Sequence, residues 1–362
     1  MDRNDGRRRT GVSRRGYLAA AGATGTAALA GCIGYGGGGP PSGTLTVATY
    51  PSMVDGDGAA GPWLKQEFEK QYPEATVEFA TPESGLNYYI QRAREGIPIE
   101  ADLYVGLNVD HLLRLDTELD DDLFDSVDSI DRRDQVKEGL EFDPKGRAVP
   151  YDTGYISLVF DESEVEEPKT FADLTTDPYE GTLIVQNAQS SATGRAFLLW
   201  TVKQFGADGY LDYWRRLDRN DITVLGTWDD AYTAYSNGER PMVVSYSTDQ
   251  VYANRYDQDM TRHQIGFLNE QGYANPEGMA RFATAGDDGL ATAFMEFVLR
   301  PEVQGEIAVR NVQFPATPNA DLPETFDKYA KEPPEPVTFT YDDLKGKVDG
   351  WVEDWAREIA QG

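Results

Sequence analysis

Histidine and cysteine are almost absent from this chain. Its 362 residues include two histidines and one cysteine, too few to support a histidine-based triad, a zinc site or a thiol enzyme. The chain also has no G-x-S-x-G elbow, no H-E-x-x-H sequence and no P-loop. Carboxylates and tyrosines are abundant, so carboxylate chemistry and the binding of a hard metal ion stay open. We expect a protein that is not an enzyme, with an extracellular hydrolase kept as the alternative class.

Basic residues are also scarce. Lysine and arginine total 33 against 62 aspartates and glutamates, which gives a net charge of −29. Such a surface argues against nucleic acid or anionic lipid as a partner. The acids are spread along the chain, as in the stretch TELDDDLFDSVDSIDRRD, rather than gathered in one tail. Because high salt screens this self-repulsion, we interpret most of the charge as halophilic adaptation.

Long hydrophobic runs are missing too, and the first residues read as a targeting signal. RRRTGVSRRGYL is a basic segment that contains the pair Arg14-Arg15. AAAGATGTAALAGC is a run of small residues that is too short to span a membrane, and its last four residues resemble a lipobox. We therefore predict a twin-arginine lipoprotein signal over 1–31 and lipid attachment to Cys32. The alternative is that Cys32 is an ordinary surface thiol.

The predicted signal, the lipid attachment site and the segment that follows them together predict where the protein resides. IGYGGGGPPSG is rich in glycine and proline, so residues 32–43 are expected to form a flexible tether. The predicted location is extracytoplasmic, with a lipid anchor in the outer face of the cytoplasmic membrane. Without the six arginines and two aspartates of the signal, the chain keeps 27 basic and 60 acidic residues, a net charge of −33.

Hydrophobic periodicity predicts two sets of alternating strands and helices, followed by a helix pair in GLATAFMEFVLRPEVQGEIAVRN and a last helix in YDDLKGKVDGWVEDWAREIAQ. Such alternation indicates an α/β fold with mostly parallel strands. The first set has strands over 43–52, 75–80 and 101–108 and helices over 61–72 and 86–95. The second set has strands in GTLIVQN, DITVLG and PMVVSYST, a helix-like TFADLT, and helices in TGRAFLLWTVKQFG and from Trp228.

Two long extended segments, AVPYDTGYISLVFD and GFLNEQGYANPEGMARFAT, link the two sets. Two α/β lobes joined by two crossovers form a clamshell, whose cleft lies where strand C-termini and helix N-termini converge. Hinge crossovers let such a clamshell close on a small ligand. We assign residues 44–151 and 265–330 to lobe 1 and residues 152–264 to lobe 2, with the C-terminal helix of 331–362 packing on a lobe.

The order of these motifs resembles a known family. The segments that carry the resemblance are LTVATYPS, ADLYVGLN, VPYDTGYISLVFD, QNAQSSATGRAFLLW, GTWDDAYTAYSNGE, MVVSYSTDQVY and FVLRPEVQGEI. They are similar to the thiamine-binding component of ABC importers, within the type II periplasmic-binding-protein fold that ferric-iron and spermidine binders share. The resemblance implies a monomeric receptor that captures thiamine or its phosphates and delivers them to an ABC permease. It implies no cofactor and no resident metal.

Two positions depart from the family pattern. Pro51 follows Tyr50, where family members have an aspartate. Val312 stands in the turn RNVQFPAT, where they have a tryptophan. Thiamine and a related cation therefore both stay open as ligands.

Four aromatic residues are candidate ligand contacts. Thiamine is a flat pyrimidine joined to a cationic thiazolium, so its site should offer aromatic faces and an acid near the positive ring. Tyr50 lies at the C-terminal end of the first predicted strand, and Trp228 lies at the start of a helix. Tyr246 and Tyr252 follow a buried strand, where the chain leaves the sheet, and resemble ligand contacts of the family. Ordinary packing at a strand end or helix entry is the alternative for each.

Serines at two helix starts are candidates for the polar end of the ligand. Ser190 and Ser191 precede a helix, and Ser84-Gly85 opens another that faces the same predicted cleft. Backbone N–H groups and hydroxyls there can hold a phosphate or a hydroxyl. Ordinary capping of the helices is the alternative.

Two further candidates lie near the crossover and after the buried strand. Asp152, in PYDTGY, either neutralises a cation or holds the crossover by a hydrogen bond. Ser247 is expected to be a polar contact and not a nucleophile, because neither histidine offers a visible base for it.

Ferric iron or a polyamine is the alternative ligand. Iron binders use neighbouring tyrosinates because Fe(III) prefers oxygen ligands, and Tyr88-Tyr89 is the one adjacent tyrosine pair of the sequence. This pair lies inside a predicted helix, where neighbours diverge by about 100°. The tyrosines of SYSTDQVY are six residues apart, which also argues against iron.

Overall fold

The computed structural model describes residues 41–56, 58–286 and 288–360. The predicted signal over 1–31, the predicted lipid attachment site Cys32 and most of the predicted tether lie outside the described residues. None of the described helices has the length and apolar character needed to cross a membrane.

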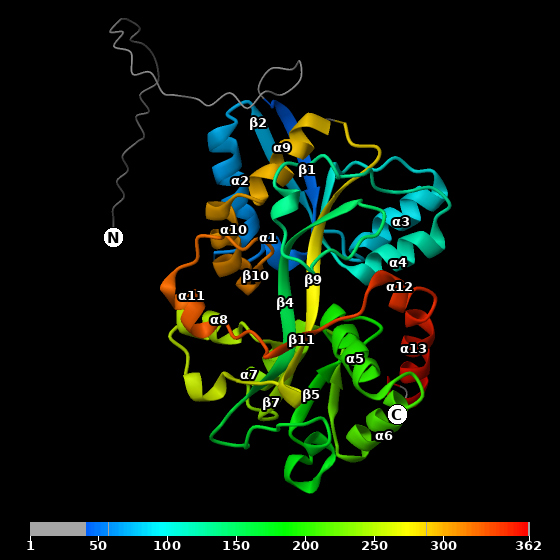
Figure 1. Cartoon of the computed structure of the whole chain (residues 1–362), viewed down its shortest axis with the longest axis vertical. Coiled ribbons are helices and arrows are strands. Elements are labelled where there is room, and N and C mark those ends of the chain that lie inside the picture. Colours follow the sequence, from blue (N-terminus) through cyan, green and yellow to red (C-terminus); the bar gives the residue numbers. More distant parts are fainter. Residues whose placement is uncertain (1–40, 57, 287, 361–362) are drawn as a thin grey trace, which may run out of the picture. The chain divides into compact units, whose positions relative to one another are not determined.

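Three parallel strands and their helices form the first part of the fold, in the upper half of Figure 1. Strand β1 pairs with β2 on one side and with β3 on the other. Leu64 and Phe68 of α2 belong to the same buried cluster as Leu45 and Val47 of β1, so the apolar stripe of the helix covers one face of the strands. The elements are β1 (Gly43–Ala48), α1 (Pro51–Val54), α2 (Ala60–Gln71), β2 (Ala75–Ala80), α3 (Leu86–Glu95), β3 (Leu103–Leu107) and α4 (Val109–Glu118), joined later in the chain by α9 (Asp288–Val298) and α10 (Pro301–Ile307).

A second parallel set lies in the lower half of Figure 1. Strand β5 pairs with β6 and with β7, both parallel. Trp200 of α5 and Trp214 of α6 are fully buried beside it, which fits the high aromatic content of these helices. The elements are β5 (Leu183–Gln186), α5 (Ala192–Phe205), α6 (Tyr210–Arg219), β6 (Thr223–Leu225), α7 (Trp228–Ser236), β7 (Met242–Tyr246), α8 (Asp249–Arg255) and β8 (Gln264–Gly266). The helix-like TFADLT contains only a short 3₁₀ turn, Asp173–Thr175.

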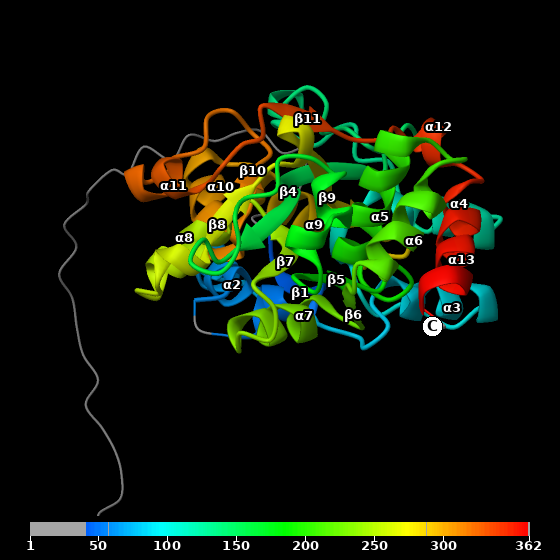
Figure 2. The same cartoon turned by 90° about the horizontal axis from the view of Figure 1, so that it is seen from below.

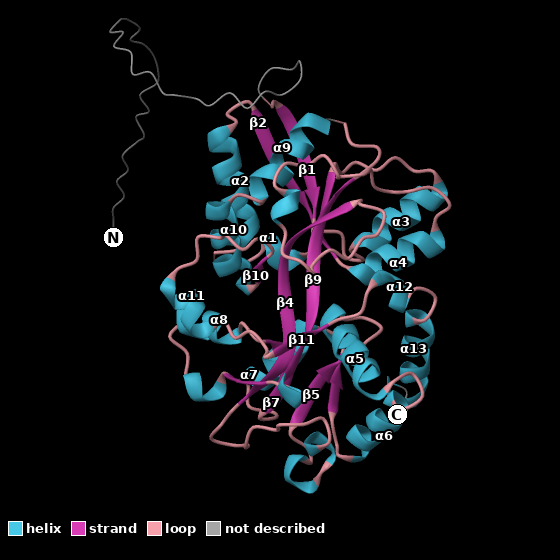
Figure 3. Ribbon diagram, in the orientation of Figure 1, coloured by secondary structure: helices cyan, strands magenta, loops and turns pink. Residues whose placement is uncertain are grey.

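Two long strands, β4 (Ala148–Phe160) and β9 (Gln271–Arg281), connect the two sets. They pair with each other antiparallel, and the strand order is β2-β1-β3-β9-β4-β7-β5-β6. The prediction of a mostly parallel sheet is therefore wrong for its centre. The pairs β3–β9, β9–β4 and β4–β7 are antiparallel, because the chain passes from one lobe to the other along β4 and returns along β9. Figures 2 and 3 show helices on both sides of this sheet.

The register of β4 against β9 shifts between Pro150 and Asp152. One extra residue in a strand turns the side chains that follow it to the opposite face. Tyr151 therefore occupies a bulge at the point where the two lobes are expected to meet. The lobe boundaries themselves stay a prediction.

The C-terminal segment touches both lobes. The expected single last helix is two helices, α12 and α13, because Gly346 adopts φ +71° between them. In α12, the Tyr341 hydroxyl donates to Asp116 Oδ2 of α4 at 2.6 Å. In α13, the Trp351 carbonyl accepts from the Tyr210 hydroxyl of α6 at 3.1 Å. The elements are β10 (Phe314–Pro315), α11 (Glu324–Tyr329), β11 (Glu335–Val337), α12 (Tyr341–Leu344) and α13 (Val348–Trp355).

Candidate ligand-binding site

A cavity of about 870 Å³ lies between the two lobes, and we call it the cleft. The first lobe lines it with residues that follow β1, β2 and β3, and the second lobe with residues that follow β5, β6 and β7. The carboxyl ends of parallel strands are where open α/β sheets bind ligands. The volume lies within the range of small-molecule sites.

The structure brings eight of the ten predicted contact residues to the cleft, and it keeps Asp152 and Ser247 out of the wall. Both of these side chains are fully buried. Asp152 accepts a hydrogen bond from Asn311 Nδ2 at 2.7 Å, whereas the hydroxyl of Ser247 has no hydrogen-bond partner among the described residues. The eight residues that line the cleft are Tyr50, Ser84, Gly85, Ser190, Ser191, Trp228, Tyr246 and Tyr252.

Aromatic rings of α7 and α8 form one wall of the cleft. The ring of Trp228 stacks on Tyr232 with centroids 4.8 Å apart and planes 22° apart. Tyr232 in turn meets the ring of Tyr252 edge-on at 6.3 Å. The indole N–H of Trp228 donates to Ser245 Oγ at 3.1 Å, so this side chain is fixed before a ligand arrives. A flat aromatic ligand can stack on such a preformed surface.

Two glycines provide room for the tyrosines that face this wall. A Cβ atom on Gly106 would lie 2.5 Å from the ring of Tyr50. A Cβ atom on Gly154, in β4, would lie 2.5 Å from Cε1 of Tyr246. Each ring therefore occupies space that a side chain at the glycine position would fill.

We expect Gly154→Ala to weaken ligand binding about tenfold, because the added methyl group pushes the Tyr246 ring out of position. Calorimetric titration of the variant measures this change. Gly350→Ala is the matched control, since nothing lies within 4 Å of a Cβ atom at that position. In a Tyr246→Ala background the same substitution should cause a smaller further loss, because the Cβ atom would still overlap with Gln313 Oε1. A full second tenfold loss there would contradict the explanation.

The floor of the cleft contains a carboxylate without a basic partner. Glu277 of β9 lines the cleft and pairs across the strands with Asp152 of β4. Glu277 accepts from the Tyr151 hydroxyl at 2.9 Å, and the Tyr151 and Tyr50 hydroxyls lie 3.2 Å apart. Within the described part of the chain, no lysine or arginine forms an ion pair with Glu277 or Asp152. The floor is therefore an acidic site surrounded by neutral hydrogen-bond donors.

Burial changes the proton affinity of this acid pair. It raises the pKa of Glu277, although hydrogen bonds from Tyr151 and Tyr50 oppose the change. Burial also raises the pKa of Asp152 well above its ordinary value, and the nearby charge of Glu277 raises it further. A cation placed above the floor would favour the ionised forms. Glu277, which lines the cleft, is the member of the pair that can meet a positive charge there.

Asn311, which links Tyr50 to Asp152, comes from a strained turn. Its Nδ2 donates to the Tyr50 hydroxyl at 2.9 Å and to Asp152 Oδ2 at 2.7 Å. It lies in a π-helical turn, η6 (Ala308–Val312), that ends with Val312 at φ +55°. This conformation is unfavourable for a β-branched residue, and the Val312 carbonyl is held by the Thr248 hydroxyl at 2.6 Å. Val312 also lines the cleft, at the position where the family pattern has a tryptophan.

Sequence reasoning missed Glu277, Asn311 and Tyr232. An acid in the middle of a long, otherwise buried extended segment was a usable signal for Glu277, because buried acids are rare without a function or a partner. Tyr232 lies one helical turn after Trp228, so it was predictable as a second ring on the same face. Asn311 gave no signal, since its position depends on the π-helical turn.

The tyrosine pair considered for iron does not reach the cleft. Tyr88 is exposed and Tyr89 is buried, with their rings at 87°, and neither lines the cavity. No cluster of three or more histidine, cysteine, aspartate or glutamate side chains arranged for a metal ion occurs in the described ranges. Burial raises the pKa of Tyr246 to about 12, which disfavours the tyrosinate that Fe(III) requires.

The cleft and the two-lobed α/β architecture define an extracytoplasmic solute-binding protein. Residues 63–334 match the model of the bacterial extracellular solute-binding proteins, and the chain belongs to this family. The thiamine-binding periplasmic protein of Salmonella typhimurium is 28% identical over 318 residues, which cover 88% of this chain and 94% of that protein. The corresponding protein of Brucella suis is 29% identical and covers 86% and 91%.

Solved structures agree with this assignment. A periplasmic thiamin-binding protein superimposes with a TM-score of 0.76 at 26% identity, over 89% of this chain and 99% of that one. The apo ferric ion-binding protein A of Pasteurella haemolytica has a TM-score of 0.69 at 14% identity, over 87% and 97%. The two-lobed periplasmic-binding-protein fold expected from the sequence is confirmed.

Proposed function

We propose that this protein is the extracytoplasmic binding component of an ABC importer and that it captures thiamine or its phosphates in the cleft. The relatives named above support the ligand. The observation that carries the proposal is the cleft itself, which combines stacked aromatic rings with an acidic floor that no basic side chain among the described residues neutralises. The protein acts by binding and release, without a catalytic step.

Each part of thiamine has a counterpart in the cleft. The flat rings would lie between the wall of Trp228 and Tyr232 and the opposing ring of Tyr50. The positive charge of the thiazolium would lie toward Glu277, which a cation at short range stabilises. Cation–π contacts with the tyrosine rings add to this attraction.

The hydroxyl or phosphate end would lie at the starts of α5 and α3. Ser190 and Ser191 lie before α5, and Ser84 and Gly85 before α3, so the two lobes offer N–H groups from opposite sides. Ser191 also caps α5, since its Oγ accepts from Gly194 N at 3.3 Å. Capping and ligand binding are compatible roles for these residues.

We also propose that the protein is exported by the twin-arginine route and anchored through a lipid on Cys32, and that it works as a monomer in salt-rich surroundings. The basic leader, the lipobox-like end of that leader and the net charge of −29 support these points. Mass spectrometry of the membrane fraction should find diacylglycerol on Cys32, and a Cys32→Ser variant should appear in the soluble extracytoplasmic fraction. An unmodified Cys32 would contradict the anchor.

Calorimetric titration in high salt with thiamine, thiamine monophosphate and thiamine diphosphate tests the ligand. We expect saturable one-to-one binding of at least one of the three. Ferric citrate and spermidine serve as controls for the alternative ligands. Absence of binding of all three thiamine compounds would overturn the proposal, and a visible tyrosinate-to-iron band on addition of ferric citrate would favour iron instead.

A further inference from the structure

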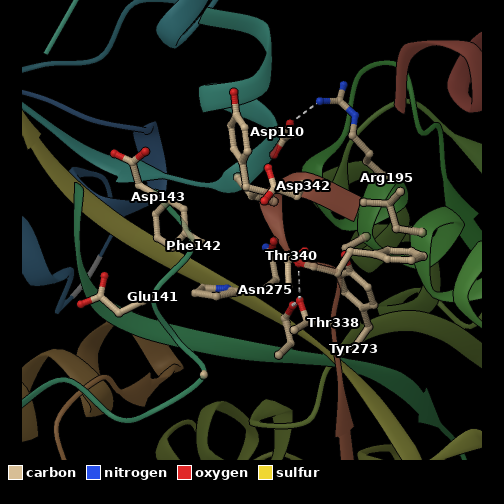
Figure 4. A pocket seen from close by; sticks show the side chains of 18 of the residues that line it. Asp110, Glu141, Phe142, Asp143, Arg195, Tyr273, Asn275, Thr338, Thr340 and Asp342 are labelled. Atoms are coloured by element: carbon tan, nitrogen blue, oxygen red, sulfur yellow. Dashed lines mark hydrogen bonds and ion pairs between the residues drawn. The ribbon is translucent and has the colours of Figure 1, made fainter. Parts of the chain in front are cut away.

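One ion pair joins α4 of the first lobe to α5 of the second. Arg195 Nη1 contacts Asp110 Oδ2, and the two side chains are 22% and 13% exposed. Figure 4 shows the two residues approaching each other from separate elements, with the ion pair drawn as a dashed line. Other well-buried pairs, such as Arg147 with Asp143, lie within one lobe.

Arg195 is held in place by its own lobe. Its Nε donates to the Ala188 carbonyl at 3.2 Å, and its Nη2 donates to the Gln189 carbonyl at 3.3 Å. The guanidinium therefore points toward α4 already, so forming the pair costs little further side-chain entropy. The helix itself does not explain this arginine, because a positive charge in the first turn of α5 opposes the helix dipole.

Asp110 is matched to this partner. It lies in the first turn of α4, where a negative charge is favourable. Burial alone would raise its pKa, but Arg195 and the adjacent His111 outweigh that effect and lower it. Asp110 is thus ionised over the whole neutral range, and the pair stays charged.

The pair also separates two cavities. Asp110, Ala192 and Arg195 line both the cleft and a second cavity of about 380 Å³, which we call the rear pocket. The rear pocket lies beside β9 and the strap of residues 338–342, as Figure 4 shows for Asn275, Thr338 and Thr340. Because Asp110 and Arg195 come from opposite lobes and both line the cleft, a rotation about β4 and β9 that moves α4 away from α5 breaks the contact.

We propose that the Asp110–Arg195 ion pair is an interlobe latch that holds the cleft closed over its ligand. This inference rests on the proposed function. A contact present only in the closed state shifts the equilibrium toward that state. Because the ligand leaves after the lobes open, the latch acts on the dissociation rate more than on the association rate.

Stopped-flow measurement of thiamine dissociation from the full chain tests the latch. Asp110→Asn and Arg195→Gln are each expected to raise the dissociation rate about tenfold, with the association rate changed by less than twofold. The reversed pair, Asp110→Arg with Arg195→Asp, should dissociate more slowly than either single variant, although it loses the bonds from Arg195 to the Ala188 and Gln189 carbonyls. Melting temperatures of the variants check that the fold is intact, because a purely structural defect would lower them without this split in rates.

Arg240→Gln is the matched control. Arg240 is 20% exposed and pairs with Asp221 within the second lobe, away from the cleft. The substitution removes an arginine about as buried as Arg195, although its partner Asp221 is 66% exposed, and it leaves the contact between the lobes untouched. Its dissociation rate should equal that of the unchanged protein.

Different experimental results would overturn the latch and the ligand assignment. Tight thiamine binding with unchanged dissociation rates in both single variants would overturn the latch and leave the proposed function intact. If no thiamine compound binds, the latch is judged from spin labels on the exposed positions Gln66 of α2 and Thr233 of α7, in a Cys32→Ser background. A larger population of long distances in Asp110→Asn supports it, and an unchanged distribution overturns it.

Discussion

Replacement of Glu277 with glutamine is expected to weaken thiamine binding about thirtyfold while leaving the ligand-free protein at least as stable as before. A unit charge about 4 Å from a cation gains about 4 kcal/mol at an effective dielectric constant of 20. We expect about 2 kcal/mol of this to remain after desolvation of both groups. Calorimetry gives the affinity, and thermal unfolding gives the stability.

Glu83→Gln is the control for this experiment. Glu83 lies at the rim of the cleft and is exposed, so the substitution removes the same charge from a position that salt screens. Its affinity should change by less than twofold. Equal losses in the two variants would mean that overall charge, and not the buried floor, attracts the ligand.

The sign of the pH dependence follows from the raised pKa of Glu277. A carboxyl group whose pKa is higher in the folded protein than in the unfolded chain contributes stability below the unfolded value, and this contribution is lost as the pH rises through the folded value. The ligand-free protein therefore becomes less stable over that window, whereas a bound cation favours the ionised form. Thiamine affinity should rise with pH over the same window, with release of protons, and Glu277→Gln should reduce both effects.

Replacement of Arg147 with glutamine is expected to lower the free energy of unfolding by about 3 kcal/mol or more. Arg147 is 3% exposed and donates to Asp143 Oδ1 at 3.0 Å and to Asp116 Oδ1 at 2.6 Å. Removal of the arginine leaves two largely buried carboxylates without their partner, which is the costly way to break a buried network. Denaturant unfolding measures the loss.

Arg133→Gln provides the comparison for Arg147. Arg133 pairs with Asp128, whose side chain is 72% exposed, so its loss should cost less than about 1 kcal/mol and should shrink further in high salt. A similar cost for the two arginines would contradict the role given to burial.

Low pH should weaken the same network of Arg147, Asp143 and Asp116. Burial alone would raise the pKa of Asp116, but hydrogen bonds from Arg147, Lys145 and Tyr341 outweigh it and lower the pKa to about 2. A carboxyl group with a lowered pKa stabilises the fold above its unfolded value and loses this contribution as the pH falls through the folded value. The contribution of Asp116 should thus disappear between about pH 4 and pH 2, and a Tyr341→Phe variant should lose stability at higher pH than the unchanged chain.

Much of the fold follows from local patterns. The strands over 75–80 and 148–160 have the bounds that their alternation and length predict, because β-branched and aromatic residues fill them and polar turns end them. The first strand ends earlier than expected, at Ala48, because Pro51 begins helix α1. The antiparallel centre of the sheet was not predictable locally, since it depends on the pairing of β4 with β9, segments more than a hundred residues apart.

The candidate site, like the fold, is predictable where local patterns decide it and unpredictable where distant segments pair. Tyr50, Trp228 and Tyr246 reach the cleft because strand ends and helix starts gather at one edge of a parallel sheet, which a sequence pattern reveals. Asp152 does not reach it, because the bulge at Tyr151 turns neighbouring side chains to opposite faces. The alternation of a strand cannot predict which face the residues beyond such a bulge occupy. The place of Glu277 in the floor was unpredictable for the same reason, because it depends on the pairing of β9 with β4 after the bulge.

The most direct test of a cation held over an acidic floor compares thiamine with 3-deazathiamine, a neutral isostere in which carbon replaces the charged thiazolium nitrogen. Calorimetric titration of both compounds in one high-salt buffer keeps shape and stacking nearly constant and changes the charge. We expect thiamine to bind at least tenfold more tightly and Glu277→Gln to remove most of this preference. Equal affinities for the two compounds would contradict this expectation.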